Sequence, residues 1–215
     1  GNLLAAIRTD EHVLGLSAKG GHMVEMDWDG NIVWEHTDHF QHHDFRRLDN
    51  GNTCYVRWAL MPEDLAAKVP GGMAGAEHED GIYGDEVIEI DVDGNVVWEW
   101  SFATDIEDYS KYPICPFEHR KEWAHANTIC PVDGGDYLIS FRQNHLIARI
   151  DRETKQFTWE MCDWKLGHQH DVQKLESGNI LVYANGAHGP YHGPNEGSRI
   201  FEIDPATNET VWEYS

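Results

Sequence analysis

The chain has few cysteines, few basic residues and no long apolar run. Its four cysteines, Cys54, Cys115, Cys130 and Cys162, are widely spaced among 215 residues, and no two form a Cys-x-x-Cys pair. This spacing excludes a zinc knuckle and a thioredoxin-like motif. No apolar run approaches the roughly 18 residues of a membrane span, and the chain does not open with the charged and apolar regions of a signal peptide. We therefore expect neither element in these residues.

Positive charge is also scarce. Sixteen Lys and Arg stand against 38 Asp and Glu, which gives a formal net charge of −22. The negative potential repels nucleic acids and anionic membranes, so neither is an expected partner. A pocket for an anionic substrate would have to be built locally from Arg, His and backbone N–H groups. With 40% hydrophobic residues, residues 1–215 are expected to form one globular domain.

What the sequence has instead is a repeat. Four segments share a strand that ends in Asp, a turn, and a return strand that carries Trp, which predicts four β-hairpins. They run from Met23 to Glu35, Val87 to Trp100, Leu146 to Met161 and Ile200 to Tyr214. The turn reads Asp-Gly-Asn twice. Because no downstream bidentate Glu follows, we interpret it as a type I′ turn rather than as a calcium loop.

Three of the hairpins are preceded by a second pair of strands, which makes units of four antiparallel strands. We predict an all-β fold with scarce helix, a β-propeller whose blades cover about 1–37, 43–102, 124–162 and 169–215. A Greek-key sandwich is the alternative, although a sandwich gives no reason for the repeat. The long connections 59–84 and 103–123 are expected to be insertions on a blade.

The first blade is expected to lack its innermost strand. Gly1-Asn2 matches the turns Gly51-Asn52 and Gly178-Asn179 inside later blades rather than the start of a blade. We therefore expect a domain that is incomplete at both ends and part of a longer, six-bladed ring, with a four-bladed ring or a homo-oligomer as alternatives.

Histidines recur at the first strand of three predicted blades, the strand that lines the central channel of a propeller. His43, His125 and His170 are each expected there at the same phase of the repeat, so that ring closure would bring them to one mouth. Arg142 closes the second strand of the His125 blade and could add a permanently charged guanidinium.

These motifs resemble the bacterial arylsulfotransferase family, which includes the aryl-sulfate sulfotransferases. The resemblance lies in HHDFRRLDNGNT, EWAHANTI, SFRQNHLIARID and GHQHDVQKLESGNILVYANG, and it spans nearly the whole chain. It implies a six-bladed propeller that moves a sulfuryl group from one phenol to another through a sulfated histidine, with no cofactor. It also implies a periplasmic or secreted protein whose partners are an aryl sulfate and a phenol.

The resemblance further implies roles for single residues. His170 would be the nucleophile, while His43, His125, Asn127 and Arg142 would surround the sulfuryl oxygens. On chemical grounds a neutral imidazole suits this attack, because it carries a free lone pair near neutral pH where Lys does not. Preorganised donors would stabilise charge on the three equatorial oxygens.

Two other functions remain open. A metal-dependent enzyme would use the imidazoles of His43, His125, His168 and His170, with His188 and His192 nearby in sequence. Alternatively, the chain is a non-catalytic propeller that binds another protein.

Overall fold

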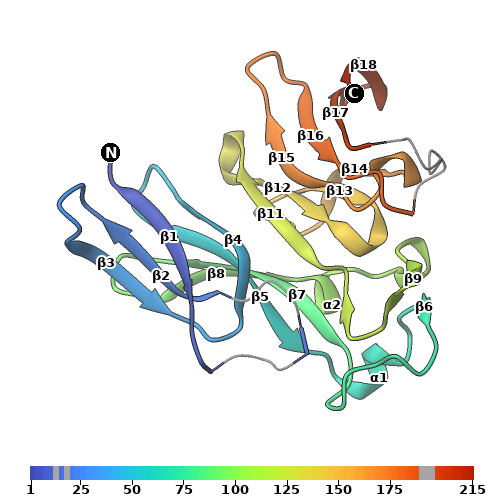
Figure 1. Ribbon diagram of the computed structural model, residues 1–215, viewed down its shortest axis with the longest axis horizontal. Helices are drawn as coiled ribbons and strands as arrows, with labels where there is room; N and C mark the ends of the chain where they lie inside the picture. The colour runs from blue at the N-terminus through green and yellow to red at the C-terminus, as the bar shows by residue number, and fades with distance from the viewer. Residues whose placement is uncertain (12–14, 17–19, 189–196) are drawn as a thin grey trace.

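The fold was analysed in a computed structural model, which describes residues 1–11, 15–16, 20–188 and 197–215. It is all-β, as predicted, and its four main sheets follow one another in chain order (Figure 1). The two α-helices, α1 (Glu63–Ala66) and α2 (Phe102–Asp105), are single turns. No helix of the described residues is long and apolar enough to cross a membrane.

Each sheet is one blade, and strands adjacent in sequence pair within it. The first blade is β1 (Leu3–Arg8), β2 (Gly21–Met26) and β3 (Ile32–Thr37), and the second is β4 (Gln41–Arg47), β5 (Thr53–Leu60), β7 (Tyr83–Ile90) and β8 (Val96–Ser101). The third is β11 (Ala126–Pro131), β12 (Tyr137–Phe141), β13 (Leu146–Ile150) and β14 (Phe157–Cys162). The fourth is β15 (His170–Lys174), β16 (Ile180–Ala184), β17 (Arg199–Asp204) and β18 (Glu209–Tyr214).

The four predicted hairpins are confirmed as the outer strand pairs of the blades. Their turn type differs from the prediction. Gly30 and Gly94 have φ of 86°, but the residues before them do not have positive φ, whereas a type I′ turn needs it at both central positions. Each Asp carboxylate accepts backbone N–H groups of the turn, as Asp27 does from Asn31 at 2.8 Å. These carboxylates therefore stabilise the turn itself.

The first blade has three strands, as expected. β1 pairs with β2, and no other strand of the described residues pairs with β1. The expectation of antiparallel pairing throughout is wrong at two places. β10 (Glu122–Trp123) pairs parallel to β7, and β6 (Gly71–Met73) pairs parallel to β9 (Ile114–His119). Both pairs come from the inserted segments, which fold back along the second blade and are not part of the repeat.

Neighbouring blades are joined along their inner strands β4, β11 and β15. The Asp44 carboxylate accepts the backbone N–H of Ile129 at 3.1 Å, and the Thr128 hydroxyl accepts that of Asp171 at 2.8 Å. These bonds fix the relative positions of the three strands that carry His43 and His170 and that directly follow His125.

The repeated tryptophans join the blades at their outer strands. The indole N–H of Trp98 donates to the carbonyl of Arg152 in the next blade, and that of Trp159 donates to the Asn208 side chain, both at 2.9 Å. In the fourth blade Trp212 is 49% exposed. The four tryptophans occupy equivalent positions in their hairpins, and Trp98 and Trp159 lie on the face toward the following blade.

The main core lies between the second and third blades and is rich in aromatic residues. Trp100, Phe102, Trp123 and Phe141 are almost fully buried in it. Two short 3-10 helices, η1 (Tyr109–Lys111) and η3 (Arg142–Asn144), adjoin this region, and η2 (Asp133–Gly135) forms the β11–β12 turn. The fourth, η4 (Trp164–Leu166), contributes Leu166 to a second core cluster between the third and fourth blades. The Trp123 indole donates to the carbonyl of Tyr112, which anchors the segment directly before His125.

Candidate active site

The candidate histidines lie where the inner strands are irregular. His43 and His125 have left-handed backbones, with φ of 51° and 64°, and Asp171, next to His170, has φ of 51°. Such conformations cost non-glycine residues roughly 1 kcal/mol each and cluster at functional sites. The pairing of β4, β11 and β15 shifts register at these points. The irregularities re-aim side chains that a regular strand would direct elsewhere.

The sequence predicted that His43, His125 and His170 share one position in the repeat, and this prediction is wrong. The Arg142 N–H donates to the carbonyl of His125, just as the Trp58 N–H donates to the carbonyl of Phe40 in the second blade. His125 therefore corresponds to Phe40 rather than to His43. The side chains of His43 and His125 meet because of the left-handed residues, not because of a common phase.

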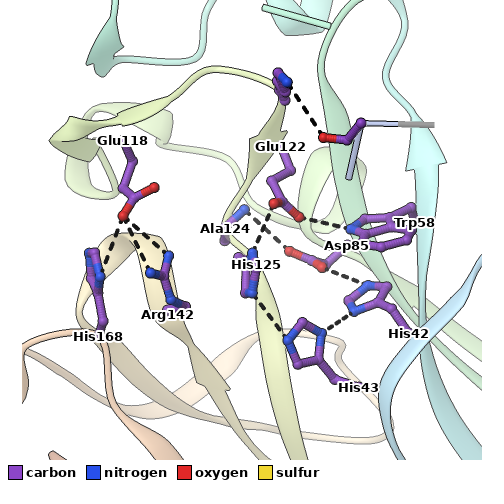
Figure 2. A network of polar contacts seen from close by, with 12 residues as sticks. His42, His43, Trp58, Asp85, Glu118, Glu122, Ala124, His125, Arg142 and His168 are labelled. Carbon is purple, nitrogen blue, oxygen red and sulfur yellow. Dashed lines mark hydrogen bonds and ion pairs between the residues drawn. The ribbon is translucent and has the colours of Figure 1, made fainter. Parts of the chain in front are cut away.

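His43 and His125 are in direct contact across two blades. Their Nε2 atoms are 3.2 Å apart, and their rings meet edge to face (Figure 2). His125 is 5% exposed, so this contact is nearly shielded from solvent. Two lone pairs cannot face each other at this distance without repulsion, so the contact requires one proton between the two nitrogens.

A third imidazole, that of His42, extends this contact within the second blade. Nδ1 of His42 lies 2.8 Å from Nδ1 of His43, and its Nε2 lies 3.2 Å from the Asp85 carboxylate. His42 and Asp85 are buried, and His42 stacks on the Trp58 ring. The other oxygen of Asp85 accepts the backbone N–H of Ala124 at 3.2 Å. Asp85 therefore orients His42 and also fixes the backbone beside His125.

A second buried carboxylate, that of Glu122, contacts the imidazole at the other end of this series of side chains. Glu122 lies 2.9 Å from Nδ1 of His125, and it accepts the Trp58 indole N–H at 3.0 Å. Burial by itself would raise the pKa of Glu122, but the charge and hydrogen bond of His125, with further contributions from His42 and Trp58, hold it below the ordinary value. The series Asp85, His42, His43, His125, Glu122, here called the imidazole chain, thus has an anionic group at each end.

The pKa of His43 responds to the whole site. Burial lowers it well below the ordinary value, and positive charge on four neighbouring side chains lowers it further: His42, His125, His170 and Arg142. The ring of His43 is therefore neutral near pH 7. That His170 and Arg142 act on His43 places all the predicted histidines and the arginine in one electrostatic neighbourhood.

This pKa shift predicts a pH dependence of stability. Below about pH 6.5 the unfolded chain protonates His43 while the folded chain does not, so unfolding becomes easier by up to about 1.4 kcal/mol per pH unit. His43→Asn should flatten the decline in unfolding free energy between pH 7 and pH 5, measured by urea denaturation. His39→Asn, at a half-exposed site, is the control. An unchanged slope in the His43 variant would contradict the assignment.

His170, the first residue of β15, is held at one ring nitrogen. Its Nδ1 lies 2.9 Å from Oδ1 of Asn185 and 3.1 Å from the carbonyl oxygen of His168. Both partners are acceptors, so Nδ1 carries the proton and donates to them. The lone pair of the neutral ring is consequently on Nε2.

Arg142 and Asn127 both have protein partners. The Arg142 guanidinium lies 3.3 Å from the Glu118 carboxylate (Figure 2). The Asn127 amide donates to the carbonyl of Gln169 at 2.7 Å, which joins the third blade to the fourth. An amide nitrogen has two N–H groups, so Asn127 keeps one donor for another acceptor.

The alternative metal ligands His43, His125, His168 and His170 do not form one group of three close ligand atoms in the described residues. In the described part of the chain, two groups of three metal-type ligand atoms lie within 4.8 Å of one another: Cys115, His145 and His168, and Glu118, His168 and His188. Of the four predicted ligands only His168 belongs to either. The expected additional ligand His192 lies outside the described residues.

Sequence reasoning missed the carboxylates and His42. Asp85 and Glu122 lie in β7 and β10, outside the repeat motifs that singled out the histidines. One signal was present, because Asp85 has the same alternation phase as the buried Val87 and Glu89 of its strand. An acid on the buried face of a strand requires a partner, and here the partner is an imidazole.

Comparison with known proteins supports both the fold and the family. A family model described as "Arylsulfotransferase (ASST)" matches residues 7–169, more than half of the chain. No curated protein matches the chain.

Two solved structures share the fold. A protein of unknown function from Bacteroides caccae is 14% identical, with a TM-score of 0.50 over 92% of this chain and 56% of its own. A luciferin-regenerating enzyme is 12% identical, with a TM-score of 0.51 over 100% of this chain and 63% of its own. The chain thus spans less than two thirds of either protein, and identities this low bear on the fold alone.

Proposed function

The chain belongs to the arylsulfotransferase family, and from this premise we propose that it transfers a sulfuryl group from an aryl sulfate to a phenol. His170 is the proposed nucleophile, and a sulfohistidine is the intermediate. The observation that carries the proposal is the tautomer of His170. Because two acceptors hold the proton on Nδ1, the lone pair of the neutral ring is on Nε2.

The reaction takes place in two displacements. In the first, Nε2 of His170 attacks sulfur, an N–S bond forms, and the bond from sulfur to the aryl oxygen breaks with its electron pair on that oxygen. In the second, the oxygen of an acceptor phenol attacks the same sulfur and the N–S bond breaks. The products are the donor's phenol and a new aryl sulfate, and the free imidazole is restored.

The imidazole chain would supply the proton that the departing phenoxide needs, and would take a proton back from the acceptor phenol. Asp85 and Glu122 favour N–H on the nitrogens nearest to them, and the His42–His43 and His43–His125 contacts need one proton each. Three rings then hold four protons, one more than three neutral rings carry. This proton, between His43 and His125, would pass to the departing phenoxide. The acceptor phenol would return it in the second displacement.

Charge on the sulfuryl oxygens needs preorganised donors. Arg142 would supply a fixed positive charge, and the free N–H of Asn127 a neutral donor. The ion pair with Glu118 orients the guanidinium but also places a carboxylate near the proposed anion site. This local arrangement would let a protein with a net charge of −22 hold a sulfate monoanion.

The proposal includes the setting of the protein. Its partners are an aryl sulfate and a phenol, it needs no cofactor, and it acts in the periplasm or outside the cell, as the family resemblance implies. The four cysteines are unpaired in the structure. Further blades would come from the rest of a longer chain or from a second copy of this one.

Turnover of a chromogenic aryl sulfate tests the function directly. We expect release of the coloured phenol to depend on added acceptor phenol and to yield one new aryl sulfate per chromophore, measured by absorbance and mass spectrometry. Both this chain and its longer parent, if one exists, should be assayed. Release without any acceptor would indicate a hydrolase instead, and no release from either protein would favour a propeller that only binds.

A further inference from the structure

A second group of metal-type side chains lies beside Arg142, outside the imidazole chain. We name it the Cys115 cluster: Cys115 and Glu118 on β9, His145 after η3, His168 before β15, and His188 after β16. Cys115, His145 and His168 are at most 2% exposed, whereas His188 is exposed. The cluster therefore has a buried base and an opening to solvent at His188.

Two overlapping groups each bring three ligand atoms within 4.8 Å of one another, namely Cys115, His145 and His168, and Glu118, His168 and His188. Sγ of Cys115 lies 3.6 Å from Nδ1 of His188, and Nδ1 of His168 lies 3.5 Å from the Glu118 carboxylate. A tetrahedral zinc with a Zn–S bond of about 2.3 Å and a Zn–N bond of about 2.05 Å separates sulfur and nitrogen by about 3.6 Å. The Cys115–His188 distance matches this value.

His168 is a buried imidazole of the cluster whose ring nitrogens are not hydrogen-bonded. Neither Nδ1 nor Nε2 of His168 makes a hydrogen bond, although the residue is only 1% exposed. A buried polar nitrogen without a hydrogen bond destabilises the fold unless a ligand satisfies it.

His145 differs from the other members. Its Nδ1 accepts the backbone N–H of His168 at 3.2 Å, so the neutral ring carries its proton on Nε2. Neither nitrogen then has a free lone pair. His145 stacks on His168, with ring centroids 4.9 Å apart, and thereby orients that ring without being a ligand.

We propose that Glu118, His168 and His188 bind a divalent transition metal of the zinc class, with Cys115, whose Sγ lies 3.6 Å from Nδ1 of His188, as the fourth ligand. Thiolate and imidazole together suit Zn²⁺ better than Mg²⁺ or Ca²⁺, which prefer oxygen ligands. Binding displaces the thiol proton of Cys115 to solvent and leaves the oxidation state of every atom unchanged. The thiolate and the Glu118 carboxylate balance the two charges of the ion.

The ion would be structural and would join three segments. β9 belongs to the inserted segment, His168 to the connection between the third and fourth blades, and His188 to the connection after β16. Glu118 also contacts Arg142, so the metal would position the guanidinium through that carboxylate. This site does not depend on the sulfuryl chemistry proposed above.

Metal titration of the purified, chelator-treated chain tests the proposal. We expect one Zn²⁺ per chain with Kd below about 1 μM by isothermal titration calorimetry, and a higher unfolding temperature with Zn²⁺. Co²⁺ should give a thiolate-to-cobalt absorption band. Cys115→Ser should remove the band and weaken Zn²⁺ binding at least about 100-fold, while Cys162→Ser, at an exposed cysteine, should leave both unchanged.

His188→Ala provides a variant at an exposed residue, where loss of folding is not expected. It should weaken Zn²⁺ binding at least about tenfold, and its circular dichroism should match that of the wild type. Absence of stoichiometric binding to the wild type, or a cobalt–thiolate band that persists in Cys115→Ser, would overturn the site. These readouts are independent of sulfotransferase activity.

Discussion

Replacing His170 with Asn is expected to abolish both covalent sulfation of the protein and sulfuryl transfer. Asn keeps a polar side chain of similar size at the start of β15 but has no nucleophilic lone pair in the place of Nε2. Since the route through a sulfohistidine cannot bypass its nucleophile, transfer should fall by about 10⁴-fold or more. Labelling with an aryl sulfate, followed by mass spectrometry of the peptide that contains residue 170, measures the intermediate directly.

His39→Asn is the matched control, because it makes the same change at a half-exposed histidine in the second blade's entry turn. It should be labelled and turned over like the wild type. Asn185→Ala removes one of the two acceptors that hold Nδ1, and it should slow labelling without preventing it. Undiminished labelling of the His170 variant would contradict the proposed mechanism, and so would a sulfated peptide that contains another histidine.

Replacing Arg142 with Ala is expected to slow transfer by about 10²- to 10³-fold, the loss typical of one preorganised donor to a developing anion. The guanidinium is oriented by Glu118 and lies close enough to affect the pKa values of His43 and His168. Its removal leaves the nucleophile intact but withdraws fixed positive charge from the sulfuryl oxygens. Rapid-mixing measurement of the first displacement should therefore show the loss.

Arg142→Lys keeps the charge but not the planar pair of donors, so it should recover only part of the rate. Arg199→Ala changes a guanidinium that pairs with Glu213 in the fourth blade, and it should leave the rate unchanged. Because Arg142 begins η3 at the end of β12, circular dichroism and urea denaturation of each variant should accompany the kinetics. A wild-type rate for Arg142→Ala would exclude it from the site.

The local pattern of the sequence was sufficient to predict the strands of the four hairpins. The Asp-turn-Trp repeat predicted all four hairpins because alternation and turn residues act over a few neighbouring positions. The repeat did not predict the turn type correctly, because the type of a turn depends on the φ angles of its two central residues. The histidine motifs also identified the family, because they are contiguous in sequence and each lies beside a recognisable strand.

Only the tertiary structure decided which groups surround those histidines. Asp85 and Glu122 are 37 residues apart and lie outside the repeat, yet they hold the two ends of one imidazole chain. The contact between His43 and His125 depends on two left-handed residues, which shift the side chains away from the phase that the repeat assigns. Strand periodicity specifies which face a side chain takes in a regular strand. It does not specify a bulge, an inserted parallel strand or the protonation of a ring, because these are set by contacts between residues far apart in the chain.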